Sequence, residues 1–311
     1  MSRNKRPKPD WLIARRRNQY TDYNVHGNFE LLDFLMEKVT NGSRTKAKYL
    51  LTNRCVQIGD SIVTQYNAPL SEGMVVRISK KKDHSEFHHN MLQLLYEDAY
   101  LLVVKKKAGL LSVATETQKE RTAQHILTEY VRRQNRKANI YVVHRLDRAT
   151  SGIMMYAKDE KTMNTLRDNW HQIVFDRRYV AVVEGEMEQD TGMVRSYLDE
   201  SGMKVHSNQQ ENGGRLAITH FRTIRRGNGY SLVELQLETG RKNQIRVHMN
   251  DLGHPVVGDR RYGAETDPLG RLCLHAFKLC FYHPVTNERM EFQDDYPASF
   301  KGLLNTLKNN K

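Results

Sequence analysis

The connection His144–Gly152 gathers side chains suited to acid–base or covalent chemistry. Asp147 supplies a carboxylate, Arg145 and Arg148 place positive charge on either side of it, and small polar residues follow. The segment lies between two expected strands, so a rigid frame would hold the carboxylate within reach of a substrate. Taken alone, Asp147 is better explained by a surface ion pair in an ordinary loop than by catalysis.

The whole string decides between these two interpretations. His144-Arg145-Leu146-Asp147-Arg148-Ala149-Thr150-Ser151-Gly152 resembles HRLDxxTSG, the signature of RluA-like RNA pseudouridine synthases, which fixes seven positions. Residues 177–185 resemble the family's Lys/Arg-x-Tyr-x-Ala-Leu-Val-x-Gly strand, and residues 239–263 resemble its third block. Leu274-His275-Ala276 and His283-Pro284-Val285 resemble its closing strands. The resemblance covers residues 92–296.

Two residues depart from the family pattern. Asn243 stands where the family usually has His, and Lys242 stands where it usually has Thr or Ser. The glycine, both arginines and Gln244 of the block are kept. We interpret the change as a variation in contacts around the site or to RNA, which affects the choice of substrate more than the chemistry.

The resemblance implies a reaction and a set of roles. The family isomerises uridine in RNA: the N-glycosidic bond breaks, and C5 of uracil is joined to C1′ of the ribose. No atom enters or leaves, so no cofactor and no metal is expected. Asp147 would attack the sugar or the uracil, or remove a ribose proton, and the sequence does not separate these routes. Tyr179 would stack on the base, and Arg145 would fill the space left by the extruded uridine.

The carboxylate needs a fixed cation, and the resemblance places that role on Arg246. If residues 244–248 form a strand, Gln244, Arg246 and His248 share one face. Arg241 then lies on the other side, as a structural or phosphate-binding residue. His144 and Gln244 are further expected RNA contacts. The structural alternatives are an ion pair for Arg246 and for Arg145, and a buried core tyrosine for Tyr179.

The apolar pattern predicts an α+β domain with a mixed, mostly antiparallel sheet, and the resemblance implies that this is the pseudouridine synthase fold. Apolar spacing predicts helices at 122–135 and at 159–171, the second capped by Asp159. Residues 233–238 alternate between apolar and polar, which predicts a strand with one solvent-facing side. Further strands are expected at 101–104, 141–143, 153–157, 179–183, 215–224, 244–248 and 272–281.

The N-terminal part is predicted to be separate from this domain. We expect a basic flexible tail at 1–25, a small α/β domain at 26–82, a linker at 83–90 and the catalytic domain at 91–311. A helix near Phe29–Leu35, a second helix capped by Ser43, and short strands after it resemble an S4-type RNA-binding domain. The RNA contacts expected there are Arg44, Lys46, Lys48 and Arg54. The alternative is a solvated helix face.

The charge balance points to a polyanionic partner. The chain of 311 residues carries 49 Lys and Arg against 36 Asp and Glu, a net charge of +13, and its first 90 residues contribute 16 − 9 = +7. This surplus favours RNA. There is no apolar run of the roughly 18 residues that cross a bilayer, so no membrane contact is expected. Three scattered cysteines favour a reducing compartment, and hence the cytoplasm.

Other chemistry has weak support in the sequence. Cys273-x-His275 and Cys280-x-x-His283 lack the paired spacing of a zinc site. The sequence therefore predicts an RNA pseudouridine synthase acting on large-subunit ribosomal RNA, with transfer RNA as the alternative substrate. A non-catalytic RNA-binding protein of ribosome assembly and a nucleoside hydrolase are the rival functions.

Overall fold

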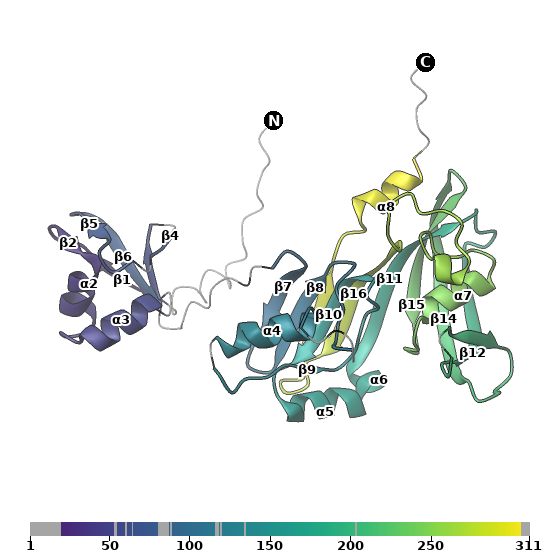
Figure 1. Ribbon diagram of the computed structural model, residues 1–311, viewed down its shortest axis with the longest axis horizontal. Helices are drawn as coiled ribbons and strands as arrows, with labels where there is room; N and C mark the ends of the chain where they lie inside the picture. Colours follow the sequence, from purple (N-terminus) through teal and green to yellow (C-terminus); the bar gives the residue numbers. More distant parts are fainter. Residues whose placement is uncertain are drawn as a thin grey trace, which may run out of the picture. The chain divides into compact units, whose positions relative to one another are not determined.

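The computed structural model describes residues 20–52, 55–59, 61–63, 65–79, 87, 89–115, 118, 120–133, 135–202 and 204–305. The chain divides into two compact units, Met1–His88 and His89–Lys311 (Figure 1). In the described residues, no helix is long and apolar enough to span a bilayer.

The first unit packs two helical segments on a small antiparallel sheet. The sheet has the order β1-β6-β3-β4. Its strands are β1 (Tyr20–Asn24), β3 (Val56–Ile58), β4 (Ser61–Ile62) and β6 (Val75–Ser79), and β2 (Phe29–Glu30) pairs separately with β5 (Pro69–Leu70). The helical segments are α2 (Leu31–Phe34), continued by a π-helical turn (Leu35–Val39), and α3 (Arg44–Thr52). Fully buried Leu31, Phe34 and Leu35 pack with Ala47 and Val76 in one core.

The basic second helix forms as expected, but the tail prediction is wrong at its end. Ser43 Oγ accepts a hydrogen bond from the Lys46 N–H (3.3 Å) and so caps α3. Residues 20–24, expected in the tail, form β1 along β6, and Val25 enters the core. The pattern was hidden because the strand is polar and only partly buried. Residues 1–19, Arg54 and most of the linker, 83–86 and 88, lie outside the described residues.

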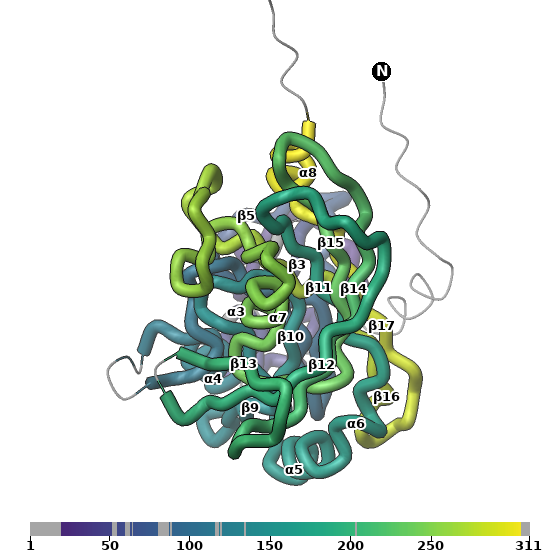
Figure 2. Tube along the Cα trace, turned by 90° about the vertical axis from the view of Figure 1, so that its right-hand side faces the viewer, coloured from purple at the N-terminus to yellow at the C-terminus, as the bar shows by residue number. Residues whose placement is uncertain are grey.

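The second unit is built on an eleven-stranded sheet of order β13-β12-β14-β15-β11-β16-β10-β8-β7 (Figure 1), with β9 beside β10 and β17 beside β16 (Figure 2). The strands are β7 (Leu92–Glu97), β8 (Leu101–Lys106), β9 (Tyr141–Val142), β10 (Ser151–Ala157), β11 (Val174–Glu184), β12 (Thr191–Asp199), β13 (His206–Asn208), β14 (Arg215–Gly227), β15 (Tyr230–Leu237), β16 (Leu274–Tyr282) and β17 (Arg289–Gln293). Among these described strands only β10 and β16 pair in parallel. The expected α+β class with a mostly antiparallel sheet is confirmed.

Two helices of this unit, α4 (Ala123–Arg132) and α5 (Glu160–Asp168), begin where the sequence indicated. In α4, the Thr122 side chain accepts from the His125 N–H at 3.1 Å. In α5, Asp159 accepts from the Thr162 N–H at 2.8 Å, and α6 (Trp170–Ile173) follows it. A short 3₁₀ turn (Arg260–Tyr262) and α8 (Ala298–Leu303) were not anticipated.

Two sequence predictions are corrected by the fold. Residues 244–248 belong to α7 (Gln244–Asp251), not to a strand. Ile245 and Val247 fit strand alternation, but five residues are too few to separate it from helical periodicity. The expected solvent-facing side of β15 is also wrong at Glu234, which is buried and accepts hydrogen bonds from two arginines and a tyrosine, namely Arg178, Arg222 and Tyr296.

Candidate active site

The connection that carries Asp147 ends at the parallel junction of β10 and β16. Gly152 lies opposite Ala276 in that junction and has φ +129°. A Cβ atom on Gly152 would overlap the backbone of Ala276, and L-residues rarely adopt this φ. The glycine that ends the His144–Gly152 segment therefore lets two strands approach closely, directly after the turn bearing the carboxylate.

Hydrogen bonds from residues 109–112 hold the main chain of this turn. The Leu146 N–H donates to Ser112 Oγ (3.2 Å), and the Ser112 hydroxyl donates to the Leu146 carbonyl (2.6 Å). The Gly109 N–H donates to the Arg148 carbonyl at 2.7 Å. Within the turn, the Thr150 N–H donates to the Asp147 carbonyl at 3.1 Å. The main chain on either side of Asp147 is thus fixed.

A buried lysine completes the support of the turn. Lys106 is fully buried, and its ammonium donates to the carbonyls of Leu110 (2.8 Å), Thr150 (2.7 Å) and, at longer range, Arg148 (3.3 Å). Burial lowers the pKa of Lys106 to about 7, although the negative charge of Asp147 acts in the opposite direction. Sequence reasoning missed this residue. In the sequence it is the middle one of three lysines between the apolar run Leu101–Val104 and Gly109.

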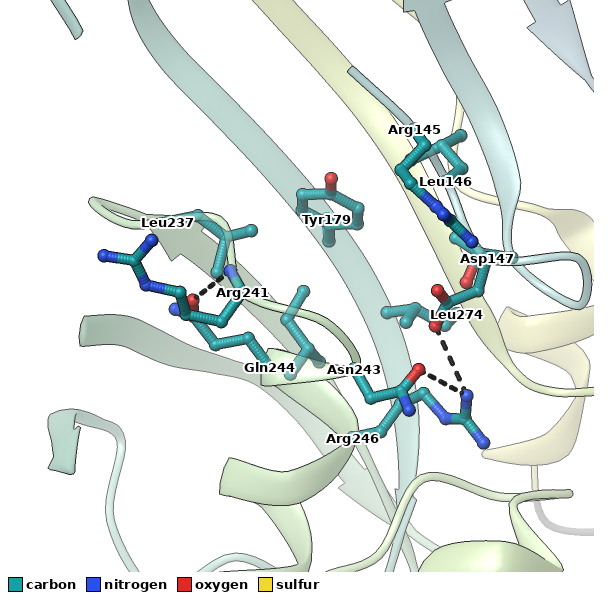
Figure 3. A pocket seen from close by; sticks show the side chains of 12 residues that line it. Arg145, Leu146, Asp147, Tyr179, Leu237, Arg241, Asn243, Gln244, Arg246 and Leu274 are labelled. Atoms are coloured by element: carbon teal, nitrogen blue, oxygen red, sulfur yellow. Dashed lines mark hydrogen bonds and ion pairs between the residues drawn. The ribbon is translucent and has the colours of Figure 1, made fainter. Parts of the chain in front are cut away.

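Arg246 reaches Asp147 across the pocket from α7 (Figure 3). Its Nη1 lies 3.3 Å from Asp147 Oδ2, so the expected juxtaposition of the two residues is confirmed although the element is a helix. The guanidinium is held more tightly by Asp259, which accepts from Nε at 2.6 Å and from Nη2 at 2.8 Å. Burial alone would lower the pKa of Arg246, but Asp259 and Asp147 together raise it.

Three residues that position Arg246 were not assigned from the sequence. Asp259 is 2% exposed and forms the bidentate pair. The ring of Tyr262 lies 4.9 Å from the guanidinium carbon. Asn243, in the left-handed conformation with φ +55°, accepts from Arg246 Nη1 (2.9 Å) and donates to the Tyr262 hydroxyl (3.0 Å). The departure at Asn243 therefore contacts the cation itself.

These side chains line a cavity of about 380 Å³, counted with its open mouth. Its lining comprises Arg145, Leu146, Asp147, Thr150, Tyr179, Leu237, Arg241, Asn243, Gln244, Ile245, Arg246 and Leu274. The phenol of Tyr179, from β11, forms part of the wall. Burial raises the pKa of Tyr179, while nearby Arg177 lowers it and Asp147 raises it. A neutral phenol is suited to stacking on a base and poorly suited to removing a proton.

Arg145 and Arg241 line the same pocket but differ in their contacts. Arg145 is exposed, and in the described part of the chain no hydrogen bond or ion pair holds its guanidinium. Arg241 donates from Nε to the Leu216 carbonyl at 2.9 Å, and its guanidinium points away from Asp147 (Figure 3). Arg241 thus has the structural contact that was one of its two expected roles.

His144 and Gln244, both expected to contact RNA, have hydrogen-bond partners within the protein. His144 does not line the pocket: its Nε2 accepts from the Met155 N–H (3.0 Å), and its ring lies 5.1 Å from that of Trp170. Burial lowers the pKa of His144 to about 3, so the ring is neutral. Gln244 accepts two hydrogen bonds and donates two within the protein, which uses its full capacity.

The cysteine–histidine pairs have other partners. Both cysteines are buried thiols. His275 Nε2 lies 3.1 Å from Asp294 Oδ2, and His283 Nε2 lies 2.8 Å from Asp98 Oδ2. Among the described residues, no group of three or more His, Cys, Asp or Glu side chains is arranged to hold a metal ion.

Comparison with known proteins identifies the family. The family model described as RNA pseudouridylate synthase matches residues 100–251. The RNA pseudouridine synthase YjbO of Bacillus subtilis is 35% identical over 213 residues, which are 68% of this chain and 75% of the relative. The RNA pseudouridine synthase MG209 of Mycoplasma genitalium is 30% identical over 292 residues, 89% and 92% of the two chains.

A solved structure and a named ribosomal enzyme extend this likeness. The structure of human RNA Pseudouridylate Synthase Domain Containing 4 has the same fold, with a TM-score of 0.55 at 22% identity over 68% of this chain and 91% of that one. Ribosomal large subunit pseudouridine synthase D of Zymomonas mobilis is 28% identical over 294 residues, 88% and 92% of the two chains. With the signature turn, the pocket and these relatives in agreement, the chain belongs to the RNA pseudouridine synthases, a family of isomerases.

Proposed function

We propose that this protein converts uridine to pseudouridine in structured RNA with Asp147 as the catalytic carboxylate. The observation that carries the proposal is the Asp147–Arg246 pair at the pocket, 3.3 Å apart and contributed by segments 99 residues apart. Asp147 is 27% exposed on its side chain, so a bound nucleotide can reach it, whereas Arg246 is more enclosed. A cation fixed beside the carboxylate orients it within the site.

The reaction balances without an added reagent. The N1–C1′ bond of uridine breaks, the uracil turns within the pocket, a C5–C1′ bond forms, C5 loses a proton and N1 gains one. Asp147 would act at the sugar or the base, while Tyr179 packs against the uracil to retain it. The exposed guanidinium of Arg145 would fill the space that the extruded uridine leaves in the stack of RNA bases. A guanidinium can stack on a base and bind a phosphate at the same time.

Substitution of Asp147 by Asn tests the catalyst. Asp147→Asn keeps the shape of the side chain but removes its charge, and we expect pseudouridine formation to fall at least about 1,000-fold in single-turnover assays. RNA affinity should change less than about tenfold, because phosphate contacts supply most of it. Asp168→Asn, at an exposed surface pair with Arg167, is the matched control and should leave the rate unchanged. An active Asp147→Asn variant would refute the assignment.

For the substrate, we propose large-subunit ribosomal RNA, modified in the cytoplasm. The support comes from three relatives, all named Ribosomal large subunit pseudouridine synthase D. They are from Zymomonas mobilis, Nitrosomonas europaea and Haemophilus ducreyi. Transfer RNA is the alternative. Mapping pseudouridines in total RNA from cells with and without the gene distinguishes the two, because the lost sites identify the RNA.

We further propose that the first unit is an S4-type domain that grips RNA through α3. Arg44, Lys46 and Lys48 are all exposed on this helix, beside Tyr49, which is also exposed. A basic helix with an exposed aromatic side chain suits backbone contacts and stacking in structured RNA.

Neutralising the three cations of α3 should reduce the salt dependence of RNA binding. In Arg44→Gln/Lys46→Gln/Lys48→Gln, each lost phosphate contact should lower the slope of log K against log salt by about 0.7–0.9. The control Lys137→Gln/Lys161→Gln/Arg167→Gln removes the same charge from exposed positions of the second unit. Equal slopes for the two triple variants would argue against the docking role.

A further inference from the structure

A chain of polar side chains lies on the face of the sheet opposite the active pocket. Successive residues of a strand face opposite sides: Leu274 of β16 lines the active pocket, and the next residue, His275, lines a second cavity. That cavity has a volume of about 1010 Å³ with its open mouth, and Ser151, Arg271 and Asp294 also line it. Neither the reaction nor the RNA contacts above use these residues.

Four side chains form a continuous series of hydrogen bonds. Arg271 Nη2 donates to Ser151 Oγ at 2.8 Å, and Ser151 Oγ lies 2.8 Å from His275 Nδ1. His275 Nε2 lies 3.1 Å from Asp294 Oδ2, which also forms an ion pair with Lys105 at 2.6 Å. Ser151 and His275 are 6% and 2% exposed. Water therefore competes little for these contacts.

The donors and acceptors along the chain have one consistent direction. A guanidinium can only donate, so the Ser151 oxygen accepts from Arg271 and its own proton is available for His275 Nδ1. The imidazole then carries its proton on Nε2 and donates it to Asp294. Burial lowers the pKa of His275 to about 4, against the influence of Asp294, which agrees with a neutral ring at neutral pH.

This series of hydrogen-bonded side chains adjoins the segments that hold Asp147 and Arg246. Ser151 is the first residue of β10, directly after the turn with Asp147, and its backbone is in register with His275. Arg271 lies next to the segment that holds Arg246: a Cβ on Gly258 would overlap the Arg271 carbonyl, and Gly258 precedes Asp259. The Cys273 N–H also donates to the Val257 carbonyl at 2.9 Å.

We propose that Ser151 and His275, oriented by Arg271 and Asp294, are positioning residues that set the placement of Asp147 relative to Arg246. The proposal rests on the catalytic role proposed for Asp147. Such placement matters for the reaction, because a displacement of about 1 Å in a reacting group costs on the order of 100-fold in rate. Residues on the opposite face of the sheet would then affect the rate without touching the substrate.

Two matched pairs of variants test this. Ser151→Ala removes one hydroxyl, and Ser231→Ala removes an equally buried hydroxyl on β15, which bonds to Met187 and Gly185 instead. His275→Asn breaks a buried His–Asp pair, and His283→Asn breaks another of the same 2% exposure, which pairs with Asp98.

We expect the first member of each pair to lower the single-turnover rate at saturating RNA about 10- to 100-fold, with RNA affinity within about threefold. The control members should lower the melting temperature comparably but keep the rate within about twofold. Ser151→Thr retains the hydroxyl and should recover most of the rate. The double variant Ser151→Ala/His275→Asn should be no slower than the slower single variant, because both act through one contact.

Two outcomes would overturn the proposal: a normal rate in Ser151→Ala, or rates that follow melting temperature equally in test and control variants. If His275→Asn does not fold, the serine variants still decide. Failure of this proposal is distinct from failure of the catalytic assignment, since the latter appears as activity in Asp147→Asn whatever the positioning variants do.

Discussion

The two walls of the pocket hold their charged groups by different means. Asp147 lies in a turn whose main chain is bound by Ser112, Gly109 and the buried ammonium of Lys106. Arg246 is held by side chains alone, chiefly Asp259 and Asn243. Substitutions around Arg246 should therefore adjust the chemistry while the fold remains intact. Substitutions beneath Asp147 should damage the fold first.

The largest effect expected from this difference is on stability, at Lys106. Lys106→Met leaves the carbonyls of Leu110 and Thr150 buried without their donor, at a cost of about 1–3 kcal/mol each. We expect the free energy of unfolding in urea to fall by about 3 kcal/mol or more. Lys107→Met, at the exposed neighbouring position, should change it by less than about 0.5 kcal/mol. A stable Lys106→Met protein would show that the turn does not depend on the ammonium.

The next largest effect is on rate, at Asp259. Asp259→Asn replaces one acceptor of the bidentate pair with a donor, so Arg246 loses its orientation. We expect the single-turnover rate to fall about 100-fold with little change in RNA affinity or unfolding free energy. Asp190→Asn breaks an exposed pair with Arg226 and is the control. If stability falls more than activity, the residues around Arg246 support the fold as much as those around Asp147 do.

The smallest effect is expected at Asn243. Asn243→His introduces the residue that the family usually has, and His tolerates the left-handed conformation found here. An imidazole can still contact Arg246 or Tyr262, so the rate should stay within about threefold. Asn243→Ala removes both contacts and should lose about tenfold. Steady-state assays on one RNA substrate compare the two, and equal rates would remove Asn243 from the support of Arg246.

Sequence patterns predicted the features that depend on local chemistry. Asp159 caps its helix as predicted, and the position of β10 follows from its apolar run. The pairing of Asp147 with Arg246 came from the family motif, and the strand geometry used to support it was wrong.

Features that depend on distant packing were not predictable in this way. Lys106 is buried only because carbonyls from the 110 and 148–150 segments surround it. Asp259 becomes a partner of Arg246 only after the 3₁₀ turn folds against α7. Gln244 carries polar groups that suit RNA, but four hydrogen bonds within the protein use them, and His144 Nε2 accepts from Met155.

The parallel junction at Gly152 has a consequence for protein synthesis. β10 is completed at Ala157, but the strand that docks against its first residues, β16, begins only at Leu274. A ribosome-bound chain that has not yet exposed β16 cannot close this junction, so the signature turn lacks one of its two flanking strands until the residues from Leu274 onward have been synthesised. The turn is therefore completed by contacts of long sequence separation, well after its own residues have left the ribosome.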